Sequence, residues 1–248
     1  DVNEARSVFS LEIIGGQATD RGSKGFISSM TAALDTVNGS SIMEIVKTLH
    51  DMGTDASQLD VLTSQAKLAL ADSWDIEDAA ALMEMADWLM KEGHNQEAIE
   101  SLIKFNPSST GDRDSFKKQL EESGEAEDIC NSILAAYDAW SAYGDDAISA
   151  WDLSRVNTIM GFGYGAGYCT YEEAMDKCLE AAKKAQESFQ SWEDFNQSYL
   201  NGYAYWTGES LDDPDSSAGN RAEIIKALSS QANGPFSVDW NMELKKDW

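Results

Sequence analysis

The placement of tryptophan constrains the fold of this chain more than any other feature. Six of its eight tryptophans fall in three short segments with helical patterns: SWDIEDAAALMEMADWLMKEGH, AWSAYGDDAISAWDLSR and SWEDFNQSYLNGYAYW. Aromatic side chains contribute a large buried area when amphipathic helices pack together. We therefore predict one connected helical core in which four of these residues are mostly buried, namely Trp88, Trp151, Trp192 and Trp206.

Hydrophobic periodicity predicts an all-α protein. From Phe26 onward apolar residues recur at helical spacing, and no pair of strand-like segments stands out. We expect a single compact multi-helix domain of about ten helices, with a short strand at a terminus as an open alternative. Residues 1–25 are predicted to be an N-terminal extension and residues 26–248 the single helical domain. One of the predicted helices, SIMEIVKTLHDMG, covers residues 41–53.

Several residues carry helix-start or helix-end signals. Asp75 is predicted to be the N-cap of the helix that contains Trp88, with Asp78 near the first-turn amides. Gly93 is predicted to end that helix in a left-handed conformation. Thr170 and Glu173 have the spacing of a capping box. Ser191 is predicted to cap the helix that begins with Trp192.

The charge of the chain narrows the range of partners. Asp and Glu number 44 and Lys and Arg number 18, which gives a formal net charge of −26. Such a surface repels nucleic-acid phosphates and anionic lipid. No apolar run is long enough to span a membrane. Two interpretations stay open: the charge serves solubility, or it meets a cationic partner such as a basic protein, a polyamine or a divalent cation.

Cysteine and histidine are sparse. Cys130, Cys169 and Cys178 contain no C-x-x-C pair, so neither a disulfide framework nor a zinc signature is indicated. With two histidines in the chain, we predict no metal site, and no motif indicates a cofactor. The sparse cysteines favour the cytoplasm. The sequence begins at Asp1 rather than at methionine, so we also expect an upstream segment, and a lipoprotein or secreted form stays an alternative.

The three tryptophan segments resemble the signatures of the bacterial domain-of-unknown-function family 1266. The first signature has the form W-D-I…L…W-L-x-x-x-G-H, and the matching residues are Trp74, Asp75, Ile76, Leu82, Trp88, Leu89, Gly93 and His94. AWDLSR, followed by Gly167 and Tyr168, is similar to the second signature, and Ser191-Trp192 with GYAYW at residues 202–206 is similar to the third. The resemblance spans roughly residues 28–206 and implies a helical fold with no agreed activity. Many members carry a basic residue where this chain has Asn95.

The second signature supplies the candidate site. Asp152 and Arg155 are three residues apart, so they share a helix face and can form an ion pair. A guanidinium beside Trp151 could bind a carboxylate or phosphate, and the alternative is a structural pair that ties helices together. Together with Tyr168 and His94, these three residues make up the predicted binding site.

The sequence leaves two hypotheses about function open. The chain has no complete catalytic motif, so no catalytic residue is assigned. The leading hypothesis is a non-enzymatic, acidic helical binding module that recognises a basic protein partner, for example as an inhibitor or immunity-type protein. The alternative is an enzyme with a small cleft around the five candidate residues that acts on a small anionic substrate. The sequence does not indicate an oligomeric state.

Overall fold

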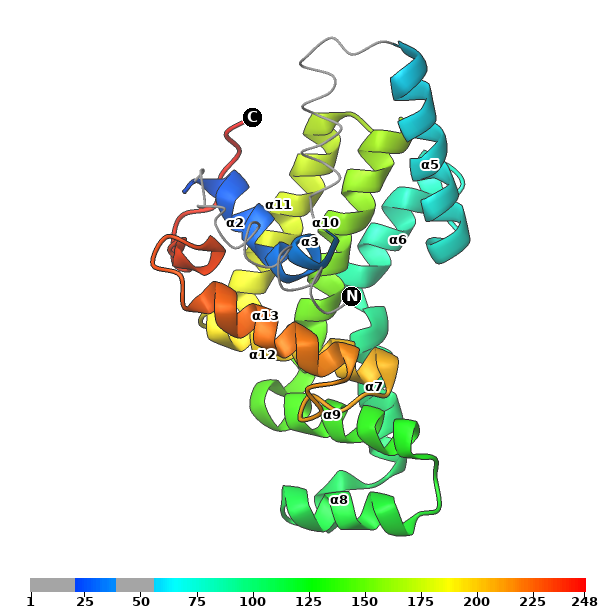
Figure 1. Cartoon of the computed structure of the whole chain (residues 1–248), viewed down its shortest axis with the longest axis vertical. Helices are drawn as coiled ribbons and strands as arrows, with labels where there is room; N and C mark the ends of the chain where they lie inside the picture. The colour runs from blue at the N-terminus through cyan, green and yellow to red at the C-terminus, as the bar shows by residue number, and fades with distance from the viewer. Residues whose placement is uncertain (1–20, 39–55) are drawn as a thin grey trace. The chain divides into compact units, whose positions relative to one another are not determined.

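The computed structural model describes residues 21–38 and 56–248, and no strand occurs among them (Figure 1). The all-α prediction is confirmed for this part of the chain, and the helix predicted at residues 41–53 lies outside it. The described α-helices are α2 (Ser23–Met30), α3 (Ala32–Asn38), α5 (Ala56–Trp74), α6 (Ala79–Lys91), α7 (Gly93–Lys104), α8 (Arg113–Glu122), α9 (Glu127–Tyr143), α10 (Ser149–Ala166), α11 (Tyr171–Ser188), α12 (Trp192–Thr207) and α13 (Ser217–Ser229).

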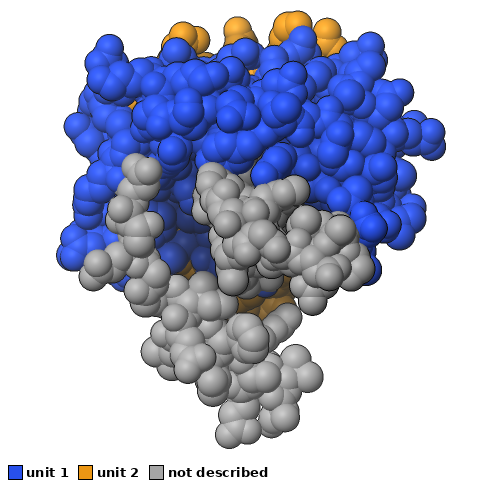
Figure 2. Space-filling view, turned by 90° about the horizontal axis from the view of Figure 1, so that it is seen from above, with its two compact units in different colours: residues 1–88, 154–184, 227–248 blue, residues 89–153, 185–226 orange. Residues whose placement is uncertain are grey.

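The chain divides into two compact units (Figure 2). Unit 1 comprises residues 1–88, 154–184 and 227–248, and unit 2 comprises residues 89–153 and 185–226. The predicted boundary between an N-terminal extension and the helical domain stays a prediction, because residues 1–20 lie outside the described part. Helix α2 begins at Ser23, three residues before the predicted start at Phe26. No helix in the described part of the chain is long and apolar enough to cross a membrane.

Unit 2 is built around α9. This helix packs against α7, α8 and α12, and Figure 1 shows it between α8 and α12. Apolar residues of α7, α8 and α9 meet in one buried cluster with two residues of the turn before α10. The cluster consists of Ala98, Leu102, Phe116, Leu120, Ile133, Ala136, Ala139, Ala147 and Ile148. Burial of such a cluster stabilises the unit by about 25 cal/mol per Å² of apolar surface removed from water.

A second buried group in unit 2 is aromatic. Trp151 is almost fully buried, and its ring contacts Tyr199, Tyr203 and Trp206, with centroids 5.5 to 5.9 Å away. Gly202 permits this packing, because a Cβ atom there would lie 2.9 Å from Cγ of Trp151. The glycine of the third tryptophan segment is therefore explained by the close approach of α12 to the first turns of α10.

The burial prediction for the tryptophans is confirmed for two and wrong for one. Trp151 and Trp192 are buried and Trp88 is half-buried, whereas Trp206 is 60% exposed. Trp206 lies in the last turn of α12, where its ring contacts Trp151 and Tyr203 and its remaining surface faces solvent. Helical periodicity predicts which face of a helix turns inward, but it does not say whether the final turn extends past the core.

In unit 1 the C-terminal residues pack on helices from earlier in the chain. Phe26 of α2 contacts Trp240, with ring centroids 5.2 Å apart. Asp176 of α11 accepts hydrogen bonds from Lys246 Nζ at 2.8 Å and from the indole N–H of Trp248 at 3.0 Å. The chain end is thus held to α11 by a charged and an aromatic contact.

The capping predictions had mixed outcomes. Thr170 and Glu173 form the predicted reciprocal bonds, and the Ser191 hydroxyl accepts the Asp194 N–H. The prediction for Asp75 as N-cap is wrong, whereas the placement of Asp78 near the first-turn amides is confirmed, since Asp78 accepts the N–H of Ala81 at the start of α6. Asp75 instead has a φ angle of 55° in the turn after α5. Two acidic residues three apart gave the same local signal, and the turn geometry decided between them.

Candidate functional site

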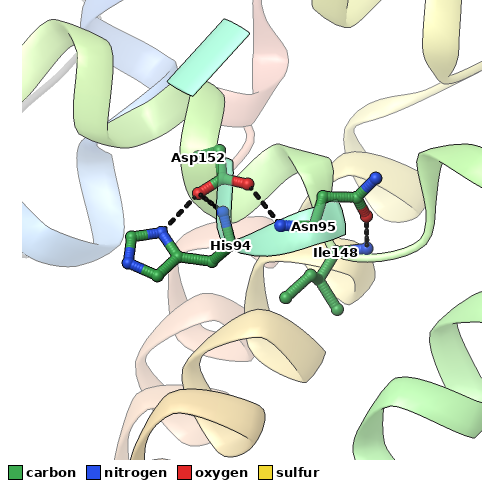
Figure 3. Close-up of polar contacts among 4 residues, drawn as sticks. All are labelled: His94, Asn95, Ile148 and Asp152. Carbon is green, nitrogen blue, oxygen red and sulfur yellow. Dashed lines mark hydrogen bonds and ion pairs between the residues drawn. The ribbon is translucent and has the colours of Figure 1, made fainter. Parts of the chain in front are cut away.

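The side chain of Asp152 holds the first turn of α7. Its two carboxylate oxygens accept the backbone N–H groups of His94 at 3.1 Å and Asn95 at 2.8 Å (Figure 3). The same carboxylate lies 2.7 Å from Nδ1 of His94. The first four N–H groups of a helix lack partners within the helix, so Asp152, which belongs to α10, serves as a tertiary N-cap for α7.

Gly93 makes room for this contact. Its φ angle is 57°, in the left-handed region predicted for it. A Cβ atom at Gly93 would lie 2.6 Å from Cγ of Asp152, which is far too close for packed atoms. A glycine is therefore required both by the backbone conformation and by the approach of the carboxylate.

Asn95 makes the reverse contact. Its side-chain oxygen accepts the N–H of Ile148 at 2.8 Å, just before α10 begins (Figure 3), and its amide group donates to the carbonyl of Asp145 at 2.7 Å. Ser198 of α12 holds the same turn, accepting from the N–H of Ala150 and donating to the carbonyl of Ala147. Helices α7 and α10 thus cap one another. Asn95, which stands where the resemblance predicts a basic residue, has a structural role.

The structure brings together two of the five predicted site residues in a direct polar contact. His94 and Asp152 bond to each other, and the Asp152 carboxylate also accepts the N–H of Asn95. The predicted pairing of Asp152 with Arg155 stays a prediction. Trp151 packs in the aromatic group of unit 2. Arg155 and Tyr168 are half-buried residues of unit 1, and Lys67 Nζ lies 5.6 Å from the centre of the Tyr168 ring.

Two adjoining cavities in unit 2 form a second candidate site, which the sequence analysis did not predict. The larger has a volume of about 490 Å³ and is lined from α8, α9, α12, α13 and residues 209–212. The smaller has a volume of about 430 Å³ and is lined from α8, α9, Glu125 and Ser210. Four lining residues are common to both cavities: Lys117, Asn131, Leu134 and Ser210. We refer to them together as the paired cavities; their volumes are in the range of small-ligand sites.

Carboxylates outnumber cations in the lining of the paired cavities. The cations are Arg113 and Lys117, and the acids are Glu121, Glu125, Glu127, Asp138, Glu209 and Asp212, so two positive and six negative charges give a formal sum of −4. Among the described residues, the side chains of Glu121, Glu125 and Glu127 make no hydrogen bond or ion pair. Arg113 and Asp138 neutralise each other in a bidentate pair with distances of 2.6 and 2.8 Å.

The carboxylates around the smaller cavity affect the pKa of the Cys130 thiol. Partial burial raises the pKa of Cys130, and the neighbouring carboxylates of Glu125 and Glu121 raise it further. A negative field disfavours the thiolate for the same reason that it favours a bound cation.

One wall of the larger cavity is held in place before any ligand arrives. Glu209 accepts the N–H of Ala218 at 2.9 Å and the hydroxyl of Ser217, so it caps α13. Asn131 of α9 donates to the carbonyl of Gly208 at 3.1 Å. The segment of residues 208–212 is thereby tied to both α9 and α13, and a ligand would lose little free energy in ordering it.

The sequence held only a weak signal for this site. The segment EESGEAED concentrates carboxylates at residues 121–128, from the end of α8 to the first turn of α9. Acidic runs are usually solvated, and the second wall is lined by residues between 197 and 222, a distant part of the chain. The cavity therefore depends on packing of distant elements that local patterns do not predict.

The family assignment follows from a comparison with family models. The model of a family described as protein of unknown function (DUF1266) matches residues 69–240. The chain belongs to this family. The match begins and ends later than the resemblance at residues 28–206, and it includes all three tryptophan segments. Comparisons with curated proteins and with solved structures found no match.

Within the DUF1266 region, the resemblance residues have a shared structural explanation. Gly93, His94 and Asp152 come from two separate signatures and meet in the capping contact between α7 and α10. The signatures in this chain therefore mark a structural junction. The paired cavities also lie inside the matched region.

Proposed function

We propose that this protein is a non-enzymatic binding module that recognises a basic protein partner through the paired cavities of unit 2. The observation that carries the proposal is the lining of these cavities, where Glu121, Glu125 and Glu127 lie without partners among the described residues. The net charge of −26 adds long-range attraction for a basic protein, which speeds the encounter.

Other cationic occupants fit less well. Among the described residues, no group of three or more His, Cys, Asp or Glu side chains is arranged to hold a metal ion, which disfavours a divalent cation. A nucleic-acid ligand is disfavoured by the charge of the chain.

The enzyme alternative has one favourable observation, the 2.7 Å contact between His94 and Asp152. A carboxylate that orients an imidazole is a common arrangement in acid–base catalysis. Here, however, the same carboxylate also accepts two helix N–H groups, so capping accounts for its burial. None of the five residues predicted for the enzyme lines the paired cavities.

The test compares two triple variants with equal charge changes. In the cavity variant, Glu121, Glu125 and Glu127 become Gln, and in the control variant Glu92, Glu97 and Glu100 of the α7 region become Gln. Each is used as bait in an extract of the native cell at low and at high salt, after circular dichroism has confirmed folding. We expect a basic protein that binds the wild type and the control at low salt, is lost from the cavity variant, and is weakened by high salt for every bait.

The proposal fails if the cavity variant retains the basic protein as well as the control does. It fails equally if no basic protein is recovered with the wild type at either salt concentration. The matched charge change separates recognition by the cavities from a general effect of acidity.

A further inference from the structure

The paired cavities differ in chemistry. In the larger cavity, seven of the sixteen lining residues are Ala or Leu, with Leu200 and Leu211 among them. Three of its five charged residues are already engaged: Arg113 pairs with Asp138, and Glu209 caps α13. This cavity therefore favours an apolar group. The smaller cavity favours a basic group, because its three glutamates have no partner among the described residues.

The junction between the cavities favours a hydrogen-bond acceptor. Lys117 lines both cavities, and among the described residues it forms no ion pair. Ser210 also lines both; its hydroxyl oxygen accepts the Asp212 N–H at 3.2 Å, so its own proton remains available to donate. An ammonium and a hydroxyl donor at one place suit a carbonyl or carboxylate oxygen of the ligand.

A uniform polycation does not complement the larger cavity, the smaller cavity and the junction between them at the same time. A linear polyamine would put positive charge or bare methylene at the junction, where Lys117 repels the first and gains no hydrogen bond from the second. A peptide offers basic side chains, apolar side chains and backbone carbonyls within a few residues of chain. These groups complement the smaller cavity, the larger cavity and the junction, respectively.

This inference rests on the proposed function. We propose that the recognised element is a short extended peptide segment that places an apolar side chain in the larger cavity, basic side chains in the smaller cavity, and a backbone carbonyl against Lys117 and Ser210. The partner is then recognised by a local sequence of mixed apolar and basic residues, and not by its overall positive charge.

The test uses three labelled probes and measures fluorescence anisotropy with the full chain. The first is a glycine-spaced peptide with two lysines and one leucine, the second has serine in place of that leucine, and the third is spermidine. We expect the leucine peptide to bind at least tenfold more tightly than the serine peptide, because burying a leucine side chain is worth that much. Spermidine should bind more weakly than either peptide.

Variants locate the effect. Leu211→Ser should remove most of the preference for leucine, whereas Ile103→Ser, a change at an exposed position of α7, should leave it intact. Lys117→Gln should strengthen spermidine binding more than peptide binding, because it removes repulsion and also a donor to the carbonyl.

The outcomes separate this inference from the proposed function. If all three probes bind equally and the cavity triple variant weakens all of them, the cavities bind cations but the mixed-peptide inference is overturned. If the triple variant changes none of the affinities relative to its control, both are overturned. If the leucine preference survives Leu211→Ser, the assignment of the apolar side chain to the larger cavity is wrong.

Discussion

At the scale of single residues, the contact between Gly93 and Asp152 shows that glycine is required at position 93 for two separate reasons. The left-handed backbone of Gly93 already favours glycine, and the carboxylate of another helix occupies the place that a Cβ atom would take. Asp152 is buried to 1% side-chain exposure, while the His94 side chain keeps 22%. A buried carboxylate is tolerated here because three donors surround it.

Replacement of Gly93 by alanine should therefore destabilise the protein by more than the backbone strain of a left-handed alanine. Strain from a left-handed alanine costs about 1–2 kcal/mol, and displacement of Asp152 adds the loss of a helix cap, roughly 1 kcal/mol more. Gly124→Ala is the matched control, because its φ angle is 82° and nothing lies within 4 Å of the new Cβ atom. Urea unfolding of both variants gives the comparison, and equal losses would show that the contact with Asp152 contributes nothing.

Cys169 should react slowly with alkylating reagents in the folded protein. Burial, with a smaller contribution from Glu173, raises the pKa of its thiol to about 12. Because the thiolate is the reactive form, its population near pH 8 falls by roughly 10³ relative to an unshifted thiol, and the rate should rise about tenfold per pH unit between pH 7 and 9. Mass spectrometry of iodoacetamide adducts, with urea-unfolded protein as the control, measures this. A folded-state rate that matches the unfolded rate would contradict the raised pKa.

At the scale of elements, helices α7 and α10 depend on each other for their first turns. Asp152 of α10 caps α7, and Asn95 of α7 holds the N–H of Ile148 before α10. Local sequence predicted caps within one segment well, as at Thr170 and Ser191. It could not predict this pair, because the donor and acceptor are more than 50 residues apart and their meeting depends on packing.

Removal of the Asn95 side chain should destabilise the junction. Asn95→Ala leaves the Ile148 N–H without this acceptor, and loss of a cap of this kind costs about 0.5–2 kcal/mol. Asn220→Ala is the control, since Asn220 is exposed in α13 and the same substitution there changes helix propensity alone. Thermal unfolding followed by circular dichroism should show a lower midpoint for Asn95→Ala. A midpoint equal to that of Asn220→Ala would mean that the side-chain bond is not needed.

At the scale of the whole molecule, periodicity and tryptophan spacing predicted the fold class, and the structure explains why they predicted the site less well. The all-α class follows from repeated apolar spacing, which each helix carries in its own sequence. The spacing on one helix predicted Arg155 as the partner of Asp152. It could not predict the contacts of Asp152 with His94 and Asn95, because those residues belong to another helix. The paired cavities were missed because Lys117, Glu125 and Leu211 come together through the packing of α8, α9 and the segment after α12.

The paired cavities of unit 2 are the proposed binding site for a basic partner. The most direct measurement is an NMR titration of the isotopically labelled protein with the lysine–leucine peptide, following backbone amide shifts. We expect the largest shifts on α8, on the first half of α9 and on residues 208–212, and we expect salt to reduce them. Shifts spread evenly over the acidic surface, with the exposed face of α7 around Glu97 affected as strongly as Glu125, would contradict this expectation.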